Sequence, residues 1–307
     1  MAPSSPREPK YKRDITPKDP LFDDPRPDDL IIPIMGLTGA GKSTFINKFC
    51  CEEIMKVNHG LESCTRQMAF HIIWLPEDHP ALPKRRLVLV DTPGFDDTTE
   101  SEHEILRRIC IWLADTYDSG TKVTGLVYLH SVGQPRMTRS AKLSYDLFHA
   151  ICGENAFSKV VMATTQWDTT LRNPEAGEFR EKDLKTKWWK EPLAQGALYK
   201  RIEEPEEDIK SAIEHLLEGH AVATQVQKEL VEEDKRVEAT EAGKKLSATL
   251  QSWSRNPNIQ DLSPEKEEEL KDSGFPVDGP FLDRVKSIFR RNKGRTSSGY
   301  VPSKIHD

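Results

Sequence analysis

The stretch GLTGAGKST at residues 36–44 decides the fold. It fits the pattern G-x-x-x-x-G-K-[ST], in which glycines let the backbone turn so that successive N–H groups point at phosphate oxygens. In this pattern Lys42 places a positive charge on the β- and γ-phosphates, and the Ser43 hydroxyl is a ligand for Mg²⁺. The alternative is a chance glycine-rich turn, which the strand expected before the loop and the helix expected after it disfavour. The predicted phosphate-binding residues are Thr38, Gly39, Ala40, Gly41, Lys42, Ser43 and Thr44.

The sequence DTPG at residues 91–94 is a second motif. Asp91 ends the apolar run Leu87–Val90, which is typical of a strand buried on both faces, and ligands bind at the carboxyl ends of such strands. The Asp91 carboxylate can hold Mg²⁺ through water, and the N–H of Gly94 can reach a γ-phosphate. A plain proline-glycine turn is the structural alternative, but its distance from the phosphate loop favours a role with nucleotide.

Residues 62–65, ESCT, lie between the two motifs. A threonine hydroxyl in this loop can reach Mg²⁺ when the γ-phosphate is present. We therefore predict Ser43, Asp91 and Thr65 as metal ligands, and Lys42 and Thr65 as the groups that act on the reacting phosphate. For Thr65 the alternative is an ordinary loop threonine.

Beyond residue 29, short apolar runs alternate with helical patterns, which is typical of an α/β fold with a mostly parallel sheet flanked by helices. The expected strands are Leu30–Met35, Ala69–Leu75, Arg86–Val90, Thr124–His130, Val160–Thr164 and Tyr199–Ile202. The expected helices are Ser43–Cys51, Ser101–Tyr117, Thr138–Cys152 and Phe179–Lys190. Proline cannot donate to a sheet ladder, so the strand that contains Pro33 is expected to start late, to bulge or to leave that amide position unpaired.

Composition divides the chain into four parts. Residues 1–28 are rich in proline and charge and bury too little apolar surface to offset their ordering entropy, so we expect a disordered arm. Residues 29–205 are expected to form the nucleotide-binding domain. In residues 206–253 apolar side chains recur at three- and four-residue steps, which predicts one long amphipathic helix packed on the core as a C-terminal helical extension. Residues 254–307 are expected to form a flexible linker and a basic amphipathic tail.

Within that tail, residues 281–295 read FLDRVKSIFRRNKGR and combine an apolar face with basic side chains. One interpretation is a weak contact with an anionic membrane surface or an anionic partner. The other is a short helix that docks on the body of the protein.

Composition also excludes classes of function. The 44 basic and 50 acidic residues give a net charge of −6, whereas a broad nucleic-acid surface needs a surplus of Lys and Arg. No apolar stretch approaches the roughly 20 residues of a membrane-spanning helix, and the first residues lack the apolar core of a signal peptide. The five cysteines are odd in number and lack metal-type spacing, so we expect reduced thiols in a cytoplasmic protein.

The motif order GLTGAGKST, SCT and DTPGFDD resembles that of the septin-like and immunity-associated GTPases, which include the chloroplast import receptors. More narrowly, LESCT at 61–65, LFHAICG at 147–153 and TQWD at 165–168 resemble fungal septin-like G-domain proteins. The resemblance covers Leu30 to Gly243. It implies a P-loop NTPase G domain that binds GTP or GDP with Mg²⁺, with the P-loop hydroxyl, Asp91 and Thr65 serving the metal and nucleotide.

The base-recognition segment departs from the pattern N/T-K-x-D that GTPases usually carry at the end of a strand. Here Val160–Thr164 leads into TQWD. Asp168 can still accept the two guanine N–H groups, which adenine does not offer. Gln166 replaces the lysine, so we expect the cation to be lost and affinity to drop. Trp167 either stacks on the base or lies in the core, and the last base-contacting loop is expected at Glu203–Pro205.

The catalytic machinery is reduced. Many small GTPases place a glutamine after DxxG to orient the attacking water, and here Phe95 takes that position. Asp96 and Asp97 are expected to be solvated residues of the switch segment and not catalytic bases. Lys42, Mg²⁺ and the loop amides are therefore expected to support only a slow basal rate.

In septin-like relatives the nucleotide face is often the dimer face, so a second subunit can supply the missing group. His130, Arg136 and Arg139 either serve such an interface or are surface charges. The leading hypothesis is a slow GTPase in the cytoplasm that acts as a nucleotide-dependent switch for dimerisation or assembly. The main alternative is a scaffold in which GTP or GDP stabilises an interface without hydrolysis. A P-loop kinase is disfavoured, because the sequence shows no acceptor-binding lid.

Overall fold

The computed structural model describes residues 9–16, 19, 21–22, 24–51, 68–79, 82–96 and 101–255. The chain divides into two units, Met1–Leu246 and Ser247–Asp307. The first unit holds the sheet and the helices that cover it. Of the second unit the structure describes residues 247–255, which are the C-terminal part of one helix.

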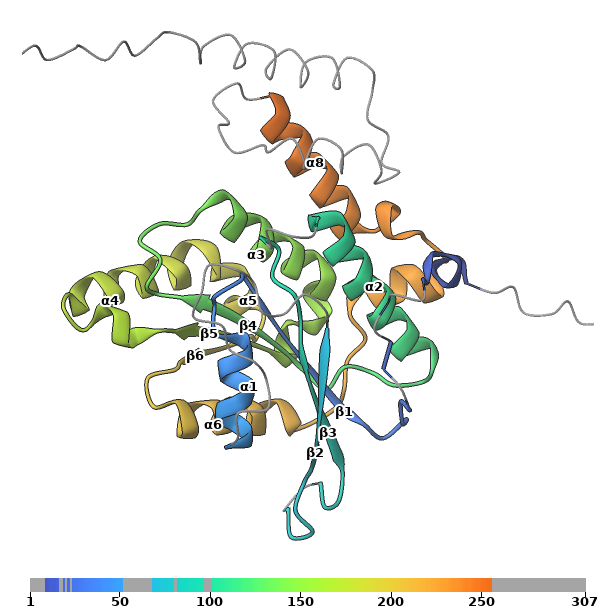
Figure 1. Cartoon of the computed structure of the whole chain (residues 1–307), viewed down its shortest axis with the longest axis horizontal. Helices are drawn as coiled ribbons and strands as arrows, with labels where there is room; N and C mark the ends of the chain where they lie inside the picture. The colour runs from blue at the N-terminus through green and yellow to red at the C-terminus, as the bar shows by residue number, and fades with distance from the viewer. Residues whose placement is uncertain are drawn as a thin grey trace, which may run out of the picture. The chain divides into compact units, whose positions relative to one another are not determined.

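Six strands form one sheet: β1 (Leu30–Gly36), β2 (Ala69–Trp74), β3 (Arg86–Asp91), β4 (Leu126–Ser131), β5 (Val160–Thr165) and β6 (Leu198–Arg201). Their order is β2-β3-β1-β4-β5-β6 (Figure 1). β2 and β3 are antiparallel, and the other neighbouring pairs are parallel. Every residue of β1, β3, β4 and β5 is buried, as expected for strands covered on both faces. The predicted α/β fold with a mostly parallel sheet is confirmed.

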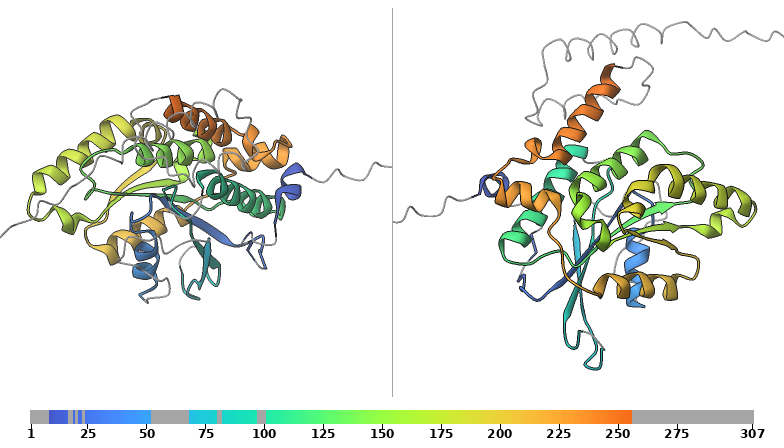
Figure 2. Two further views of the ribbon diagram at one scale, coloured as in Figure 1. Left: turned by 45° about the horizontal axis from the view of Figure 1, so that its top comes forward. Right: turned by 180° about the vertical axis from the view of Figure 1, so that it is seen from behind.

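The helices are α1 (Lys42–Cys50), α2 (Glu102–Asp118), α3 (Arg139–Cys152), α4 (Pro174–Asp183), α5 (Lys190–Ala194), α6 (Pro205–Leu217), α7 (Gln225–Gln227) and α8 (Glu241–Arg255). Short 3₁₀ or π turns occupy Lys10–Asp14, Glu154–Lys159, Trp167–Thr170, Leu184–Trp188, Lys228–Glu232 and Val237–Ala239. Helices cover both faces of the sheet (Figures 1 and 2). On one face Phe45 of α1 and Ile213 of α6 share a core cluster with Leu129 of β4. On the other face the ring of Tyr128 packs on Phe148 of α3, with 4.8 Å between ring centroids.

Side-chain caps explain why two of the predicted helices start where they do. The hydroxyl of Ser101 accepts a hydrogen bond from the N–H of Glu104 at 3.0 Å, at the start of α2. The hydroxyl of Thr138 does the same for Ala141 at 3.1 Å, at the start of α3. Such caps satisfy N–H groups that have no partner inside the helix. The predicted α1, α2 and α3 agree with the structure to within one residue at each end.

Pro33 lies inside β1, and the sheet accommodates it on the side of β4. The carbonyl of Ile31 accepts a hydrogen bond from the N–H of Thr124 at 2.9 Å, so the backbone polar groups of Ile31 face β4. Because these groups alternate along a strand, position 33 faces the same side. Regular pairing with β4 begins at Ile34, after the isolated bridge between Ile31 and Val123. The missing N–H of Pro33 therefore faces a gap in the ladder, which is the unpaired position that the sequence predicted as one alternative.

Residues 206–253 do not form one long helix, contrary to the prediction. α6 ends at Leu217, and Gly219 has a left-handed φ of 76°. Val222 then pairs with Val123, and each N–H donates to the carbonyl of the other residue. Thr224 begins the next helical turn with a capping box. The apolar spacing continues across this break because the later turns also bury apolar side chains, so periodicity alone could not reveal it.

The predicted helix Phe179–Lys190 is also divided. α4 ends at Asp183, a π turn spans Leu184–Trp188, and α5 begins at Lys190. Trp189 lies between them with φ −101° and ψ 8°, outside the helical range, and its side chain is fully buried. Burial of this large ring therefore accompanies the break in the helix.

The described part of residues 9–28 is packed within the first unit, against α2, which differs from the predicted disordered arm. Tyr11 is fully buried, and its hydroxyl donates to Asp118 Oδ2 at 3.1 Å. Lys12 forms an ion pair with the same carboxylate at 2.6 Å. Arg107 of α2 binds Asp19 at 2.6 Å. A buried ring and paired charges offset the ordering entropy on which the prediction was based.

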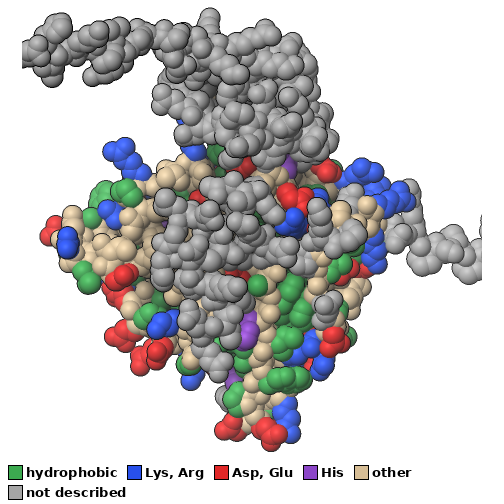
Figure 3. Space-filling view, in the orientation of Figure 1, with side chains coloured by type: hydrophobic (Ala, Val, Ile, Leu, Met, Phe, Trp, Pro, Cys, Tyr) green, Lys and Arg blue, Asp and Glu red, His purple; other side chains and the backbone are tan. Residues whose placement is uncertain are grey.

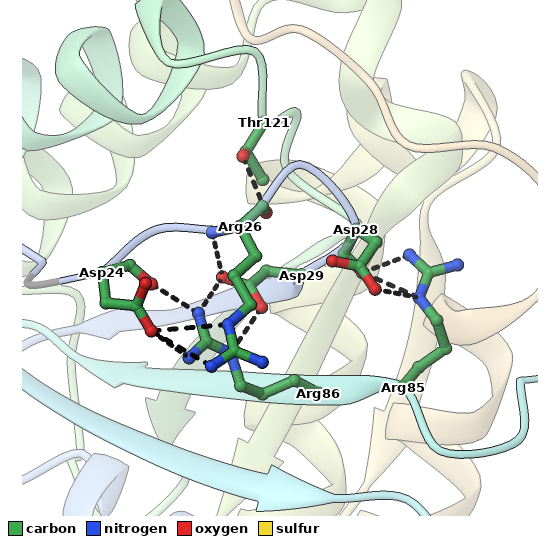
Figure 4. Close-up of polar contacts among 7 residues, drawn as sticks. All are labelled: Asp24, Arg26, Asp28, Asp29, Arg85, Arg86 and Thr121. Carbon is green, nitrogen blue, oxygen red and sulfur yellow. Dashed lines mark hydrogen bonds and ion pairs between the residues drawn. The ribbon is translucent and has the colours of Figure 1, made fainter.

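Arg86 of β3 anchors the chain just before it enters the sheet (Figure 4). Its Nε and Nη2 atoms donate to the two carboxylate oxygens of Asp29 at 2.6 and 2.7 Å, and Nη2 also donates to the carbonyl of Asp24 at 2.6 Å. Arg86 and Asp29 are both buried. The hydrogen bonds that Arg86 donates to Asp29 raise the pKa of Arg86 above its usual value, so the guanidinium stays charged. This forked pair joins the N-terminal segment to β3.

Removing this carboxylate tests the anchor. Asp29→Asn leaves the Arg86 guanidinium buried without a formal counter-charge at its forked contact, and we expect a loss of about 3 kcal/mol in the free energy of unfolding. Urea unfolding followed by circular dichroism measures it. The control is Asp28→Asn, whose exposed carboxylate lies 3.9 Å from Arg85. Equal stability of the two variants would contradict an anchoring role for Asp29.

Candidate functional site

Residues 36–44 form the turn between β1 and α1. Gly39 and Gly41 have φ angles of 75° and 91°, in the left-handed region that favours glycine. Gly41 is also the N-cap of α1, so the helix N-terminus lies at the end of the loop. A helix N-terminus attracts anions through its unpaired N–H groups. The loop therefore has the backbone conformation and the polarity expected of a phosphate site.

Lys42 lies within this loop. Its side chain is 6% exposed, and Nζ donates to the carbonyls of Gly36 at 3.1 Å and Leu37 at 2.8 Å. These two bonds hold the ammonium along the inner side of the turn. A bound phosphate would meet a cation that is already positioned and partly shielded from water, where charge interactions are stronger.

Ser43 and Asp91, two of the three predicted metal ligands, are in direct contact. Ser43 Oγ donates to Asp91 Oδ2 at 2.6 Å, and Asp91 is 1% exposed. A hydroxyl and a carboxylate are the hard oxygen donors that Mg²⁺ prefers. The chemistry of this donor pair, next to the ammonium of Lys42, fits an Mg²⁺ ion that also contacts phosphate. Among the described residues no cluster of three or more His, Cys, Asp or Glu side chains offers another metal site.

The segment after Asp91 lies against the phosphate loop. A methyl group at Gly94 would come within 2.5 Å of the Thr38 hydroxyl. Only glycine therefore lets the segment after Asp91 approach the phosphate loop this closely. The N–H of Thr38 donates to Asp96 Oδ1 at 2.8 Å, which corrects the expectation that Asp96 is simply solvated. The Thr38 hydroxyl is buried and has no hydrogen-bond partner among the described residues. An orphaned donor here is consistent with a site that a ligand completes.

Phe95, which follows DTPG, is 1% exposed. Its ring is part of the core and cannot orient a water molecule. This position therefore cannot supply the function of the usual glutamine.

The loop after β5 contacts the phosphate loop through side chains. Gln166 has a left-handed φ of 60°, and its Nε2 donates to the carbonyl of Gly39 at 2.6 Å. Ser131 at the end of β4 donates to Gln166 Oε1 at 2.5 Å. Thr165 donates to the carbonyl of Ala40 at 2.8 Å. We call Ser131, Thr165 and Gln166 the polar clamp, because together they join the ends of β4 and β5 to the phosphate loop.

The sequence predicted Gln166 as a nucleotide-binding residue that has lost the charge of the usual lysine, and it did not identify Ser131 or Thr165 as part of the site. The signal that could have found them is their position, since both are polar residues at the carboxyl ends of buried parallel strands.

Asp168 and Trp167 follow on a short 3₁₀ turn. Asp168 is exposed and available to a base. Trp167 is buried, its indole N–H donates to Thr164 Oγ1 at 3.1 Å, and the Arg201 guanidinium lies 3.8 Å from the ring centroid. The structure therefore places Trp167 in the core, the second of the two predicted alternatives. Glu181 holds the pKa of Arg201 above its usual range, so the cation over this ring persists.

The predicted last base-contacting loop forms the start of α6. The N–H groups of Glu203 and Glu204 both donate to Asp208 Oδ2, at 3.0 and 2.9 Å. No side chain of this loop is brought to the phosphate loop by an interaction among the described residues.

Thr65 and Asp97 lie outside the described residues, as does the tail segment 281–295. Their predicted roles remain predictions.

His130, near the end of β4, is buried and not a surface charge. Burial lowers its pKa to about 4, so the imidazole is neutral at pH 7. Its ring lies 6.1 Å from the ring of Trp189 in an edge-on arrangement. Arg136 and Arg139 are exposed, on the loop after β4 and at the start of α3.

Residues 31–132 match the sequence profile of a family described as 50S ribosome-binding GTPase. The matched residues include the phosphate loop. The strand order of the sheet and the geometry of this loop agree with such a family. The chain contains a P-loop GTPase G domain. The matched part of this G domain includes the phosphate loop and DTPG, and it ends before Gln166 and Asp168.

Solved structures resemble this G domain at low identity. Toc33 from Arabidopsis thaliana in complex with GDP and Mg²⁺ is 16% identical, with a TM-score of 0.44 over 65% of this chain and 88% of that chain. A structure of the chloroplast translocon components atToc33 and psToc159, described as showing that dimerisation is important for their GTPase activity, is 13% identical, with a TM-score of 0.43 over 63% of this chain and 85% of that chain. Era in complex with MgGDPNP and part of 16S ribosomal RNA is 12% identical, with a TM-score of 0.42 over 64% of this chain and 59% of that chain. TM-scores below 0.5 do not support transfer of function.

A search of curated proteins finds no match to the sequence. Among the described residues of the chain, no helix has the length and the apolar character needed to cross a lipid bilayer.

The buried His130 makes the stability of the G domain depend on pH. Its pKa is about 4 in the folded state and 6.5 ordinarily, so the unfolded chain binds more protons between these values. Above pH 6.5 the neutral His130 does not reduce the stability of the fold. As the pH falls from 6.5 toward 4, the free energy of unfolding decreases by about 3 kcal/mol because of this group. We expect the stability of His130→Gln to fall less steeply over this range in urea unfolding. The control is His220→Gln, because His220 is exposed. If the stability of the two variants fell equally steeply with pH, His130 would not be the source of the pH dependence.

Proposed function

We propose that the chain binds GTP and GDP with Mg²⁺, hydrolyses GTP slowly and uses the nucleotide to control its own dimerisation or assembly. The observation that carries this proposal is the contact between Ser43 and Asp91 beside the buried ammonium of Lys42. Two hard oxygen ligands and a cation meet where phosphates would lie against the loop N–H groups. Bound Mg²⁺ would neutralise phosphate charge there. Thr65 is proposed as a further oxygen ligand.

The guanine base is proposed to be selected by Asp168, whose exposed carboxylate can accept two N–H groups. Gln166 supports this role differently from a lysine. It supplies no charge, but its hydrogen bond to the Gly39 carbonyl fixes the base loop relative to the phosphate loop. Affinity is therefore expected to be lower than with a lysine, while guanine selectivity is kept.

Hydrolysis is proposed to be slow, because Phe95 stands where many small GTPases carry a glutamine, and its buried ring cannot orient water. Lys42 and the loop N–H groups stabilise charge on the transferring phosphoryl group, which is the part of phosphoryl transfer that positioning and electrostatics provide. A group from a second subunit would raise the rate. Arg136 and Arg139 are exposed and remain proposed for that interface.

The switch is proposed to act through Asp96. Its hydrogen bond to the N–H of Thr38 connects the phosphate loop to the segment that leads into α2, which begins at Glu102. A change at the γ-phosphate would alter this contact. Dimerisation through the nucleotide face would then depend on which nucleotide is bound. The motif order supports kinship with septin-like GTPases, and fungal septin-like proteins in particular.

A second candidate function is a scaffold that binds nucleotide without useful hydrolysis. The observation that favours it is the complete burial of Phe95, which removes the usual water-orienting position from the site. In that case GTP or GDP would stabilise an interface and would not be turned over.

Other proposals rest on composition. A net charge of −6, with both signs of charge interspersed over the described residues of the face in Figure 3, supports a protein that does not bind nucleic acid. We also propose a cytoplasmic location and a weak contact of residues 281–295 with an anionic partner or membrane surface.

Turnover separates the first candidate from the second. We expect wild-type protein to release phosphate from GTP over many turnovers, and Lys42→Ala to lose this activity because the phosphates lose their cation. The measurement is phosphate release with and without Mg²⁺, and a matched control is the exposed Lys210→Ala on α6. Excess ATP is expected not to compete. Release from wild type no faster than from Lys42→Ala would favour the scaffold.

Nucleotide-coupled assembly is a separate prediction. Multi-angle light scattering should give a larger mass with a non-hydrolysable GTP analogue than with GDP. Asp96→Asn is expected to reduce this difference, because it weakens the acceptor that contacts the Thr38 N–H. The same mass with both nucleotides would refute the switch and leave nucleotide binding untouched.

A further inference from the structure

A pocket of about 330 Å³ lies next to the polar clamp, between the loop after β4 and the segment formed by α4 and its π turn. This volume is at the low end of the range for small-molecule sites. Ser131 contributes to its wall and also to the polar clamp. The pocket is separate from the phosphate loop, since none of residues 36–44 lines it.

Two polar side chains of the pocket each have a group without a hydrogen-bond partner among the described residues. His130 is 7% exposed, lines the pocket, and its imidazole makes no hydrogen bond with a described residue. The side-chain oxygen of Gln134 is buried and has no hydrogen-bond partner among the described residues. Because the two ends of an amide are interchangeable by a flip, Gln134 can present either a donor or an acceptor. Buried polar groups without partners are uncommon and indicate a missing ligand or water.

The charge of the pocket is positive. Arg136 and Arg180 both line it, and neither forms an ion pair with a described residue. Arg180 Nη1 donates to the carbonyl of Val132 at 2.6 Å, which fixes the guanidinium and leaves its other N–H groups for a ligand. The carboxylate that lines the pocket, Asp183, is already paired with Lys187 at 2.9 Å. Two guanidinium groups therefore remain for an anion.

The rest of the lining is apolar and partly aromatic. Phe179 lines the pocket and is 64% exposed, and Trp188 lines it from the π turn. Rings of this kind offer flat surface to a flat apolar group. Convergent polar groups on an apolar wall are the usual composition of a ligand site.

We propose that this pocket binds a small organic anion, with a carboxylate or phosphate head between Arg136 and Arg180 and a flat apolar body against Phe179 and Trp188, and that its occupancy alters nucleotide affinity. The second half rests on the proposed nucleotide function. The link is short: Ser131 contacts Gln166 at 2.5 Å, and Gln166 contacts the Gly39 carbonyl at 2.6 Å. A ligand that moves the wall of the pocket moves this clamp.

The first test is direct binding to the full chain. Isothermal titration without nucleotide uses phenylacetate and phenyl phosphate as probes, with inorganic phosphate for the head alone and benzyl alcohol for the body alone. We expect saturable binding of both aryl anions and none of benzyl alcohol. Arg136→Ala is expected to weaken phenylacetate about tenfold through loss of a charge-assisted contact. The control is Arg139→Ala, an exposed arginine outside the pocket.

Ala176→Phe provides a second variant, because Ala176 lines the pocket and a larger ring would fill it. It is expected to abolish phenylacetate binding while circular dichroism and GDP binding are unchanged. Undiminished binding to Ala176→Phe would place the anion elsewhere, for example on the phosphate loop, and would overturn the proposal. No saturable binding of either aryl anion would overturn it as well.

Coupling is measured as the release rate of a fluorescent GDP analogue. Saturating phenylacetate is expected to change this rate about fivefold in wild type and to leave it unchanged in Ala176→Phe. An unchanged rate in wild type would contradict the coupling. Failure of GDP to bind at all would contradict the proposed function, and the direct titration would still decide whether the pocket binds anions.

Discussion

The hydrogen bond between Ser43 and Asp91 is the interaction on which the site depends. It exists because β1 and β3 are adjacent and parallel, with Ile34 in register with Asp91, so the chain segments that follow them emerge side by side. The glycines of the first segment turn it into a phosphate loop, and the glycine of the second lets it lie against Thr38. Sheet topology therefore fixes the distance between the proposed metal ligands, which two sequence motifs 48 residues apart could not fix by themselves.

The polar clamp extends the same principle to β4 and β5. Ser131 and Thr165 lie at the carboxyl ends of these strands. Together with Gln166 they connect β4 and β5 to the phosphate loop by hydrogen bonds. The clamp is neutral, so it positions the loop through geometry and adds no charge. This arrangement explains how the proposed base loop, which lacks the usual lysine, can keep its place relative to the phosphate loop. It also makes the pocket beyond Ser131 a neighbour of the nucleotide site.

Much of the fold and the centre of the site could be predicted from the sequence, because local patterns specify them. The phosphate loop, DTPG and the buried strands each combine a short motif with apolar runs. Contacts between distant segments could not be predicted in this way. Three features depend on partners far along the chain, which composition and periodicity do not reveal. They are the hydrogen bond from Tyr11 to Asp118, the pairing of Arg86 with Asp29, and the break in the helix after Leu217.

The most direct test of the account is the effect of Mg²⁺ on GDP release. If Ser43 and Asp91 hold Mg²⁺ against the phosphates, removal of Mg²⁺ by a chelator should speed GDP release from wild type about tenfold or more. In Ser43→Ala the release should already be fast and should respond little to the chelator. GDP release from wild type that ignores Mg²⁺, or a full Mg²⁺ response in Ser43→Ala, would contradict the central claim.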